Sequence, residues 1–286
     1  MNNLYSSNLI LLINTTNFSL NIGIEIEVCT TRKSEKNINK NNKLKYFINT
    51  NNATIKCNDG FYSHEYIIDP SPNILFIKNN KLTEIFHNIN IINKNSIQCK
   101  DDSCGLHFHI SSDNIKLSIQ GLFFLINFIL NWNDKYQKEF EERFFYKKYV
   151  GKSYSPPLDL SQKNKELLKE QKKKLIININ KNTNKKFLLS ILNKIIYITR
   201  INNKNLNKNL NKNININNLY IYSISPPKRA YLTIVKDEKF IHVEFRDLLP
   251  WALKRTIINF PALVKEKYLE TIKETNDEIE EINKKL

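Results

Sequence analysis

The chain has 286 residues, a net charge of +16 and five glycines. At this length it can bury a sizeable core, as one large domain or two small ones. Lysine, asparagine and isoleucine dominate even in stretches without a pattern, such as 33–45 and 201–218. The positive charge therefore indicates a chain-wide compositional bias, and we expect no specific nucleic-acid partner.

Disulfide scaffolds and membrane proteins are also disfavoured. The four cysteines, Cys29, Cys57, Cys99 and Cys104, show no framework spacing, and the chain is long for a stapled scaffold. We expect no signal segment at the start, and the apolar stretch 117–132 is shorter than the roughly 20 residues that span a bilayer. We read that stretch as a buried helix, and we expect a soluble protein of a reducing, cytoplasmic compartment without a membrane partner.

In the first half of the chain, residue periodicity and turn signals predict a mixture of strands and helices. The predicted elements are a strand over 4–30, a surface loop over 32–42, a hairpin over 53–68, a helix over 79–93 and a strand around 104–111. The hairpin prediction depends on the turn sequence Asn58-Asp59-Gly60.

The second half is predicted to be mainly helical, with one pair of strands. The predicted elements are a long helix over 117–149, helices over 162–176 and 185–200, a low-complexity insertion over 201–218, strands over 230–236 and 239–247, and a helical region from 250 to 286. Pro261 should break that last region. Because strands with related patterns come from both ends of the chain, we expect one domain over residues 1–286.

Three strand-like segments alternate apolar and charged residues with a period of two. The residues that share the charged faces are Glu25 and Glu27 in the first segment, His107 and His109 in the second, and His242, Glu244 and Arg246 in the third. Any one segment is more typical of a half-exposed antiparallel strand with a charged outer face. The three together favour a sheet that builds a polar cavity able to hold metal ions.

The residue types suggest a metal-nucleotide site. Hard cations such as Mg²⁺ prefer carboxylate and phosphate oxygens. Carboxylates two residues apart on a strand lie roughly 6.5–7 Å apart, which suits the separation of two cations. The five glycines are never close together, which excludes a P-loop and a dinucleotide fingerprint. A protein with this composition would have to hold ATP phosphates with metal, arginine and lysine.

A zinc site is the alternative. Cys99, Cys104, His107 and His109 form a C-x4-C-x2-H-x-H arrangement, and all four are credible zinc ligands. Against this alternative, two histidines on one strand do not converge easily on a single ion. A zinc-stabilised binding domain therefore remains a distant possibility.

The same segments resemble the elements of the amidoligase family, which belongs to the glutamine synthetase and gamma-glutamylcysteine ligase superfamily of carboxylate-amine ligases. The matching segments are Gly23–Glu27, Cys104–Ser111 and Val243–Arg246. They contain the family's G-x-E-x-E, C-G-x-H-x-H and E-F-R patterns, in that order, and the resemblance spans about residues 22–270. The central motif is the most specific of the three.

The resemblance implies an α+β fold with a curved, largely antiparallel, glutamine-synthetase-like sheet and helices packed on one side. It implies Mg²⁺, with Mn²⁺ as an alternative, and ATP as co-substrate. The implied roles are metal ligation by Glu25, Glu27, His107, Glu244 and Glu65, contact with ATP phosphates by His109 and Arg246, and binding of phosphate or substrate carboxylate by Arg229 and Arg143. Glu25, Glu27 and Arg246 would be catalytic. The reaction would phosphorylate the carboxylate of an amino acid, peptide or protein and then join it to an amine.

Two departures from the family pattern concern the substrate pocket. Thr233 stands where relatives tend to have asparagine, and Asp247-Leu248-Leu249-Pro250 replaces a turn that usually contains Gly-Thr. These departures motivate a second hypothesis, in which the chain is an inactive relative that binds a nucleotide or a partner protein.

Overall fold

The protein is represented by a computed structural model. The residues that the structure describes are 9–40, 44, 47–50, 57–68, 82–96, 105–144, 158, 160–178, 184–200, 232–236, 241–248 and 254–285. The predicted insertion over 201–218 lies outside them.

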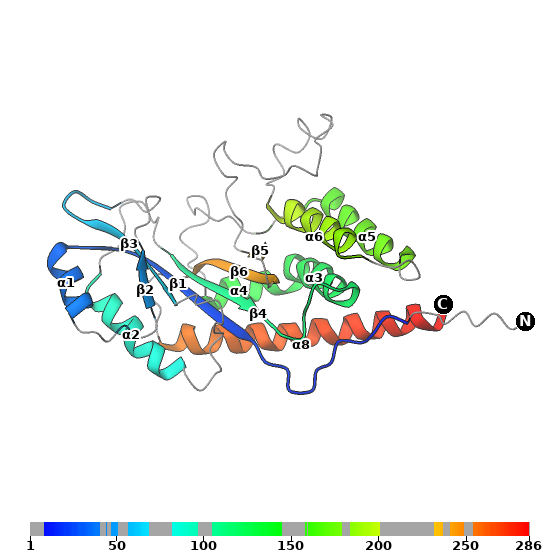
Figure 1. Ribbon diagram of the computed structural model, residues 1–286, viewed down its shortest axis with the longest axis horizontal. Coiled ribbons are helices and arrows are strands. Elements are labelled where there is room, and N and C mark those ends of the chain that lie inside the picture. Colours follow the sequence, from blue (N-terminus) through cyan, green and yellow to red (C-terminus); the bar gives the residue numbers. More distant parts are fainter. Residues whose placement is uncertain are drawn as a thin grey trace, which may run out of the picture.

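In the described part of the chain, six strands form one antiparallel sheet in the order β2-β3-β1-β4-β6-β5 (Figure 1). In chain order the strands are β1 (Asn21–Thr30), β2 (Phe47–Thr50), β3 (Tyr62–Ile68), β4 (Leu106–Ser111), β5 (Leu232–Lys236) and β6 (Ile241–Leu248). The mixture of helices with an antiparallel sheet confirms the expected α+β class. The sheet also confirms the predicted strand at 104–111 and the final pair of strands.

The helical elements are α1 (Arg32–Lys40), α2 (Leu82–Lys94), α3 (Ile119–Asn131), the π-helix η2 (Trp132–Tyr136), α4 (Gln137–Phe144), α5 (Gln162–Ile177), α6 (Lys185–Arg200) and α8 (Lys254–Lys285). Helix α8 is the longest and runs past the strands (Figure 1). The helices predicted over 79–93, 162–176 and 185–200 are confirmed as α2, α5 and α6.

One face of the sheet forms the core against α8. Alternate residues of β1 (Ile22, Ile24 and Ile26) are buried, as the period of two predicts. In the neighbouring β4, Phe108 stacks on Phe260 of α8 with ring centroids 4.9 Å apart. Burial of each such side chain contributes roughly 1.5–3 kcal/mol. The opposite face of the sheet is therefore left for the polar side chains.

The predicted long helix over 117–149 is confirmed to residue 144 as α3, η2 and α4 in succession; 145–149 lie outside the described residues. Ser118 caps its start by accepting a hydrogen bond from the backbone N–H of Gly121 at 3.1 Å. A Cβ at Gly121 would lie 1.9 Å from the Lys116 carbonyl oxygen, so only glycine allows this tight entry. Among the described helices, none is long and apolar enough to cross a bilayer.

The prediction of a strand over 4–30 is wrong for residues 9–20, because the regular strand begins at Asn21. The backbone N–H and C=O groups of Ile10 both bond to the Asn283 side chain of α8, at 3.0 and 2.9 Å. Ile13 bonds to Asn276 in the same way, at 2.8 and 3.0 Å. The segment is thus held by asparagine side chains rather than by a neighbouring strand.

The prediction of a surface loop over 32–42 is also wrong, because residues 32–40 form α1. The hydroxyl of Thr31 accepts a hydrogen bond from the backbone N–H of Ser34 at 3.1 Å, which caps the helix. Ile38 is buried and anchors one face of the helix. The signal that could have identified α1 was therefore the cap rather than a wide apolar stripe.

The predicted hairpin is confirmed only in its second strand. That strand is β3, but its partner β2 lies earlier in the chain than the predicted first strand, and 51–56 lie outside the described residues.

The predicted break at Pro261 is wrong, because α8 continues through this residue. Proline removes one helical hydrogen bond, but burial of the preceding Phe260 and of Val264, about one turn further on, holds the helix in place.

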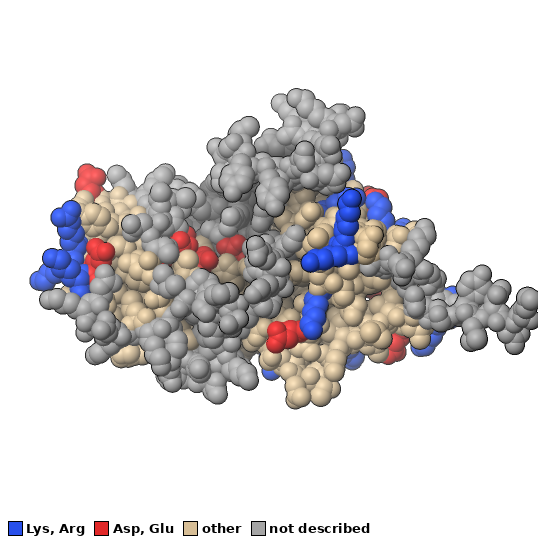
Figure 2. All heavy atoms as spheres, in the orientation of Figure 1, with Lys and Arg blue, Asp and Glu red and all other residues tan. Residues whose placement is uncertain are grey.

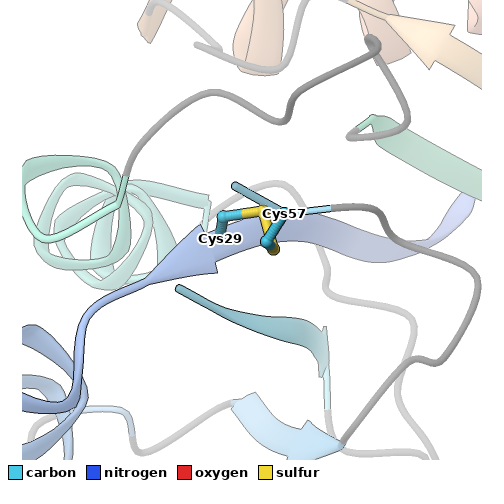
Figure 3. Close-up of a disulfide and its surroundings, with 2 residues drawn as sticks. All are labelled: Cys29 and Cys57. Carbon is cyan, nitrogen blue, oxygen red and sulfur yellow. A yellow bond between two sulfur atoms is a disulfide. The ribbon is translucent and has the colours of Figure 1, made fainter. Parts of the chain in front are cut away.

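A disulfide joins Cys29, near the end of β1, to Cys57, which precedes β3 (Figure 3). The two Cα atoms are 5.7 Å apart, within the usual range. Cysteine spacing in the sequence gave no sign of this pair, because the two cysteines are 28 residues apart and meet only when β1 pairs with β3. Cys99 and Cys104 lie outside the described residues.

We expect Cys57→Ser to lower the free energy of unfolding by roughly 3–4 kcal/mol, because the cross-link restricts the unfolded chain. Denaturant unfolding of the wild type and the variant, each with and without a reductant, measures this difference. The reductant should shift the wild-type midpoint down to that of the variant and leave the variant unchanged. Equal midpoints for oxidised wild type and variant would contradict the contribution of the disulfide.

Stability is expected to fall on acidification because of His64, which is buried on the core face of β3. Its Nδ1 lies 3.1 Å from Asn49 Oδ1, while its Nε2 is buried without a hydrogen-bond partner among the described residues. Burial lowers the pKa of His64 below its usual 6.5, against a smaller opposing effect of Glu35. The unfolded chain therefore takes up the proton first, and stability is full above about pH 6.5 and declines as the pH falls below it.

His64→Asn keeps a polar group near the Nδ1 position but cannot titrate. We expect this variant to be less stable at neutral pH and to show a flatter dependence of unfolding free energy between about pH 7 and pH 5. Denaturant unfolding at several pH values measures both slopes. Identical slopes would show that His64 does not carry the acid sensitivity.

Candidate functional site

The glutamates and histidines of the three strand motifs lie together on the face of the sheet opposite the core. Strand register places Glu25 of β1 opposite His107 of β4, and His109 of β4 opposite Glu244 of β6. Directly opposed residues of antiparallel strands have Cβ atoms about 5 Å apart, so their side chains interact. The period of two and this register together bring motifs from distant parts of the chain into one cluster.

His107 lies among three carboxylates. Its Nδ1 is 3.1 Å from Glu25 Oε2 and 3.9 Å from Glu244 Oε1, and its Nε2 is 3.5 Å from Glu27 Oε2. The imidazole thus links the acidic groups of β1 to that of β6. Burying several charged groups is costly unless each has a partner of opposite charge or a hydrogen bond. The cluster therefore differs from the solvent-exposed charged face of an ordinary antiparallel sheet.

His109 occupies the more open side of the cluster. Its Nε2 lies 2.8 Å from Glu25 Oε1, and its Nδ1 lies 3.0 Å from Nε2 of His242 in β6. Gly23 stands opposite His109, and a Cβ at that position would come within 3.2 Å of the His109 Cβ. The glycine of the first motif therefore leaves room for the His109 side chain.

Access to the cluster is uneven. The side chains of Glu25 and His109 are each 19 % exposed, whereas those of His107 and Glu244 are 1 % and 2 % exposed. Figure 2 shows acidic atoms near the middle of this view of the molecule. A small ligand would therefore meet Glu25 and His109 first.

The electrostatic environment keeps Glu25 ionised. Burial alone would raise the pKa of this carboxyl, but the imidazoles of His107 and His109, which lie close to its two oxygens, lower it far below its ordinary value. Glu25 is therefore an anion across the physiological pH range, which is the form that binds cations.

One ligand atom from each of Glu25, His109 and Glu244 lies within 4.8 Å of the others, so the three could hold one cation. Around an octahedral Mg²⁺ with bonds of about 2.1 Å, adjacent ligand atoms are about 3 Å apart. The 2.8 Å between His109 Nε2 and Glu25 Oε1 is close to this spacing, and the pair lacks the alignment of a regular hydrogen bond. The donor set and its geometry thus suit a divalent cation.

The structure assembles the metal-competent group somewhat differently from the sequence expectation. His109, expected at a phosphate, belongs to the group, while His107, expected as a ligand, lies among the carboxylates behind it. Glu65 of β3 stands opposite Glu27 in the register, so its side chain shares the same face. The structure thus places all five acidic and histidine ligand candidates of the expected set on one face of the sheet.

The structure says less about the three arginines that the sequence analysis named as site residues. The backbone of Arg246 lies in β6, two residues beyond Glu244, and Arg229 lies outside the described residues. Arg143 is exposed on α4, where its Nη2 lies 3.0 Å from Glu139 Oε1. Among the contacts between described residues, none links Arg143 to the cluster.

Two other expectations from the sequence concern the site. Thr233 of β5 stands opposite Glu244 in the register, so the departure from the family pattern lies beside the cluster. The zinc alternative requires Cys99 and Cys104, both outside the described residues.

His242 was placed on the charged face by its alternation with Glu244, but the sequence analysis gave it no role. Its contact with His109 depends on the pairing of β4 with β6.

Comparison of the chain with models of protein families, with curated proteins and with solved structures gives no match.

Proposed function

We propose that the chain is an ATP- and Mg²⁺-dependent carboxylate-amine ligase, an amidoligase with a glutamine-synthetase-like sheet. The observation that carries the proposal is the convergence of Glu25, His109 and Glu244 from three separate motifs, with ligand atoms within 4.8 Å. The resemblance of those motifs to the amidoligase family supports the choice of reaction. Mn²⁺ could replace Mg²⁺, because carboxylate oxygens suit both ions.

In the proposed reaction, a carboxylate oxygen of an amino acid, peptide or protein attacks the terminal phosphorus of ATP. The bond to the bridging oxygen breaks, and ADP leaves. An amine nitrogen then attacks the acyl-phosphate carbon, phosphate leaves with the carbon–oxygen bond pair, and the nitrogen loses a proton to give the amide. A bound cation would offset the negative charge of the phosphates during this transfer.

The chain's own residues would have distinct tasks. Glu25, His109 and Glu244 would hold the cation, with Glu27, His107 and Glu65 beside them on the same sheet face. By the family resemblance, Arg246 and Arg229 would contact ATP phosphates, and Arg229 or Arg143 would bind the substrate carboxylate.

Use of ATP favours a cytoplasmic protein, although disulfides such as Cys29–Cys57 are more common in oxidising compartments.

The proposal is tested by trapping the acyl phosphate with hydroxylamine. Wild-type protein is incubated with ATP, Mg²⁺ and a panel of amino acids and peptides, and hydroxamate and ADP are measured. We expect both products with at least one carboxylate, in equal amounts, and neither product without Mg²⁺. ADP release that does not depend on a carboxylate would contradict a ligase.

An inactive relative that binds a nucleotide is the second candidate, and the position of Thr233 opposite Glu244 favours it. In that case, titration calorimetry would show saturable binding of ATP with Mg²⁺, while the whole carboxylate panel would give no hydroxamate. The two measurements together separate an enzyme from a binding protein.

A further inference from the structure

The two nitrogens of the His109 ring have different neighbours. Nε2 lies 2.8 Å from Glu25 Oε1, on the side of the carboxylate group, and Nδ1 lies 3.0 Å from His242 Nε2. The centroids of the two imidazole rings are 5.0 Å apart, and the rings meet edge to face. His109 is thus held between a carboxylate on β1 and an imidazole on β6.

The proton arrangement follows from what a cation requires. A histidine nitrogen binds a cation through its lone pair, so His109 Nε2 can bind only if the ring proton is on Nδ1. The Nδ1–H group then needs an acceptor, and His242 Nε2 is at hydrogen-bonding distance. His242 can accept only with its own proton on Nδ1.

We propose that His242 is a positioning residue that holds His109 in the Nδ1–H form and turns its Nε2 toward the cation. This inference rests on the proposed cation site. Histidines that bind metals usually donate their second N–H to an outer partner, and loss of that partner typically weakens metal binding 10- to 100-fold. In this chain the partner is a second histidine rather than a carboxylate or a backbone carbonyl.

Local sequence and register explain why His242 reaches this position. His242 and Glu244 point to the same face of β6, and Glu244 stands opposite His109. His242 is therefore the diagonal neighbour of His109, a separation that long side chains can bridge. On the other side, Gly23 leaves the space in which the His109 side chain lies.

Two amide substitutions form a matched pair for testing the role of His242. In His242→Gln the side-chain oxygen can reach the place of Nε2, whereas the shorter side chain of His242→Asn reaches only that of Nδ1. Calorimetric titration with Mn²⁺ alone is the probe. We expect His242→Asn to bind Mn²⁺ about 10- to 100-fold more weakly than the wild type, and His242→Gln to stay within about threefold.

A second route tests whether His242 acts through His109. His109→Gln keeps an Nε2-like ligand but has no Nδ1, so it should weaken Mn²⁺ binding and make the further change His242→Asn ineffective. In addition, ¹⁵N spectra of the five histidines with Mg²⁺ should show one ring with a proton on Nδ1 and a cation-shifted Nε2. That signal should disappear in His242→Asn.

The outcomes separate this inference from the proposed function. Wild-type affinity in His242→Asn, together with lost affinity in Glu25→Gln, would overturn the role of His242 and leave the cation site standing. Equal Mn²⁺ affinity in the wild type and Glu25→Gln, or no binding by either, would overturn both. Weak binding by His242→Gln as well as His242→Asn would also contradict the inference, because an acceptor at the Nε2 position would then not suffice.

Discussion

Glu25→Gln is expected to lower Mg²⁺-dependent ADP release by more than about 100-fold, since even the loss of an outer partner of a metal ligand costs 10- to 100-fold. Glu25 places one oxygen 3.1 Å from His107 Nδ1 and the other 2.8 Å from His109 Nε2. Glutamine has nearly the same shape, but it has no charge and only one acceptor oxygen. The substitution should therefore abolish the proposed cation binding while preserving the packing around the cluster.

The measurement is a steady-state ADP assay with a carboxylate and hydroxylamine, alongside circular dichroism and thermal unfolding. Glu170→Gln, an equivalent change of an exposed carboxylate on α5, is the matched control and should keep wild-type activity. We expect Glu25→Gln to retain the wild-type secondary structure. Full activity in a folded Glu25→Gln protein would contradict the assignment of Glu25 as a ligand of the cation.

Phe245→Ala is expected to lower the free energy of unfolding by about 3–5 kcal/mol, the usual cost of removing a buried aromatic side chain. Phe245 is buried on the core face of β6, next to Glu244 of the cluster. Its ring centroid lies 5.1 Å from that of Trp132 and 5.2 Å from that of Phe260. The variant would leave a cavity at the junction of the sheet, the π-helix η2 and α8.

Denaturant unfolding followed by tryptophan fluorescence measures this loss, because Trp132 adjoins the site of the change. Phe245→Leu fills most of the space and should cost less than half as much. If Phe245→Ala unfolded at the wild-type denaturant concentration, the aromatic cluster could not be what fixes β6 against the helices.

Much of the candidate site could be predicted from local patterns. The alternation around Glu25, His107 and Glu244 correctly separated the polar face of each strand from its core face, because strand geometry imposes a period of two. The register could not be predicted in the same way. That His109 rather than His107 lies opposite Glu244 depends on a pairing across 135 residues, for which the sequence carries no short-range signal.

The incorrect fold predictions share a physical cause, which is that distant or unusual partners replace the expected ones. Residues 9–13 resemble a strand in composition, but their backbone groups bond to asparagines of α8. Helix α1 is too polar for an apolar stripe, and its cap at Thr31 was the available signal. The Pro261 residue is tolerated within α8 because the residues around it are packed in the core.

The most direct test of the cation site is a crystal structure of the protein grown with Mn²⁺, with anomalous diffraction data recorded near the manganese absorption edge. A peak between Glu25, His109 and Glu244, absent from crystals of Glu25→Gln, is the result we predict. An anomalous map without a peak at these residues, in crystals grown at millimolar Mn²⁺, would contradict the proposal that the three strands build a divalent-cation site.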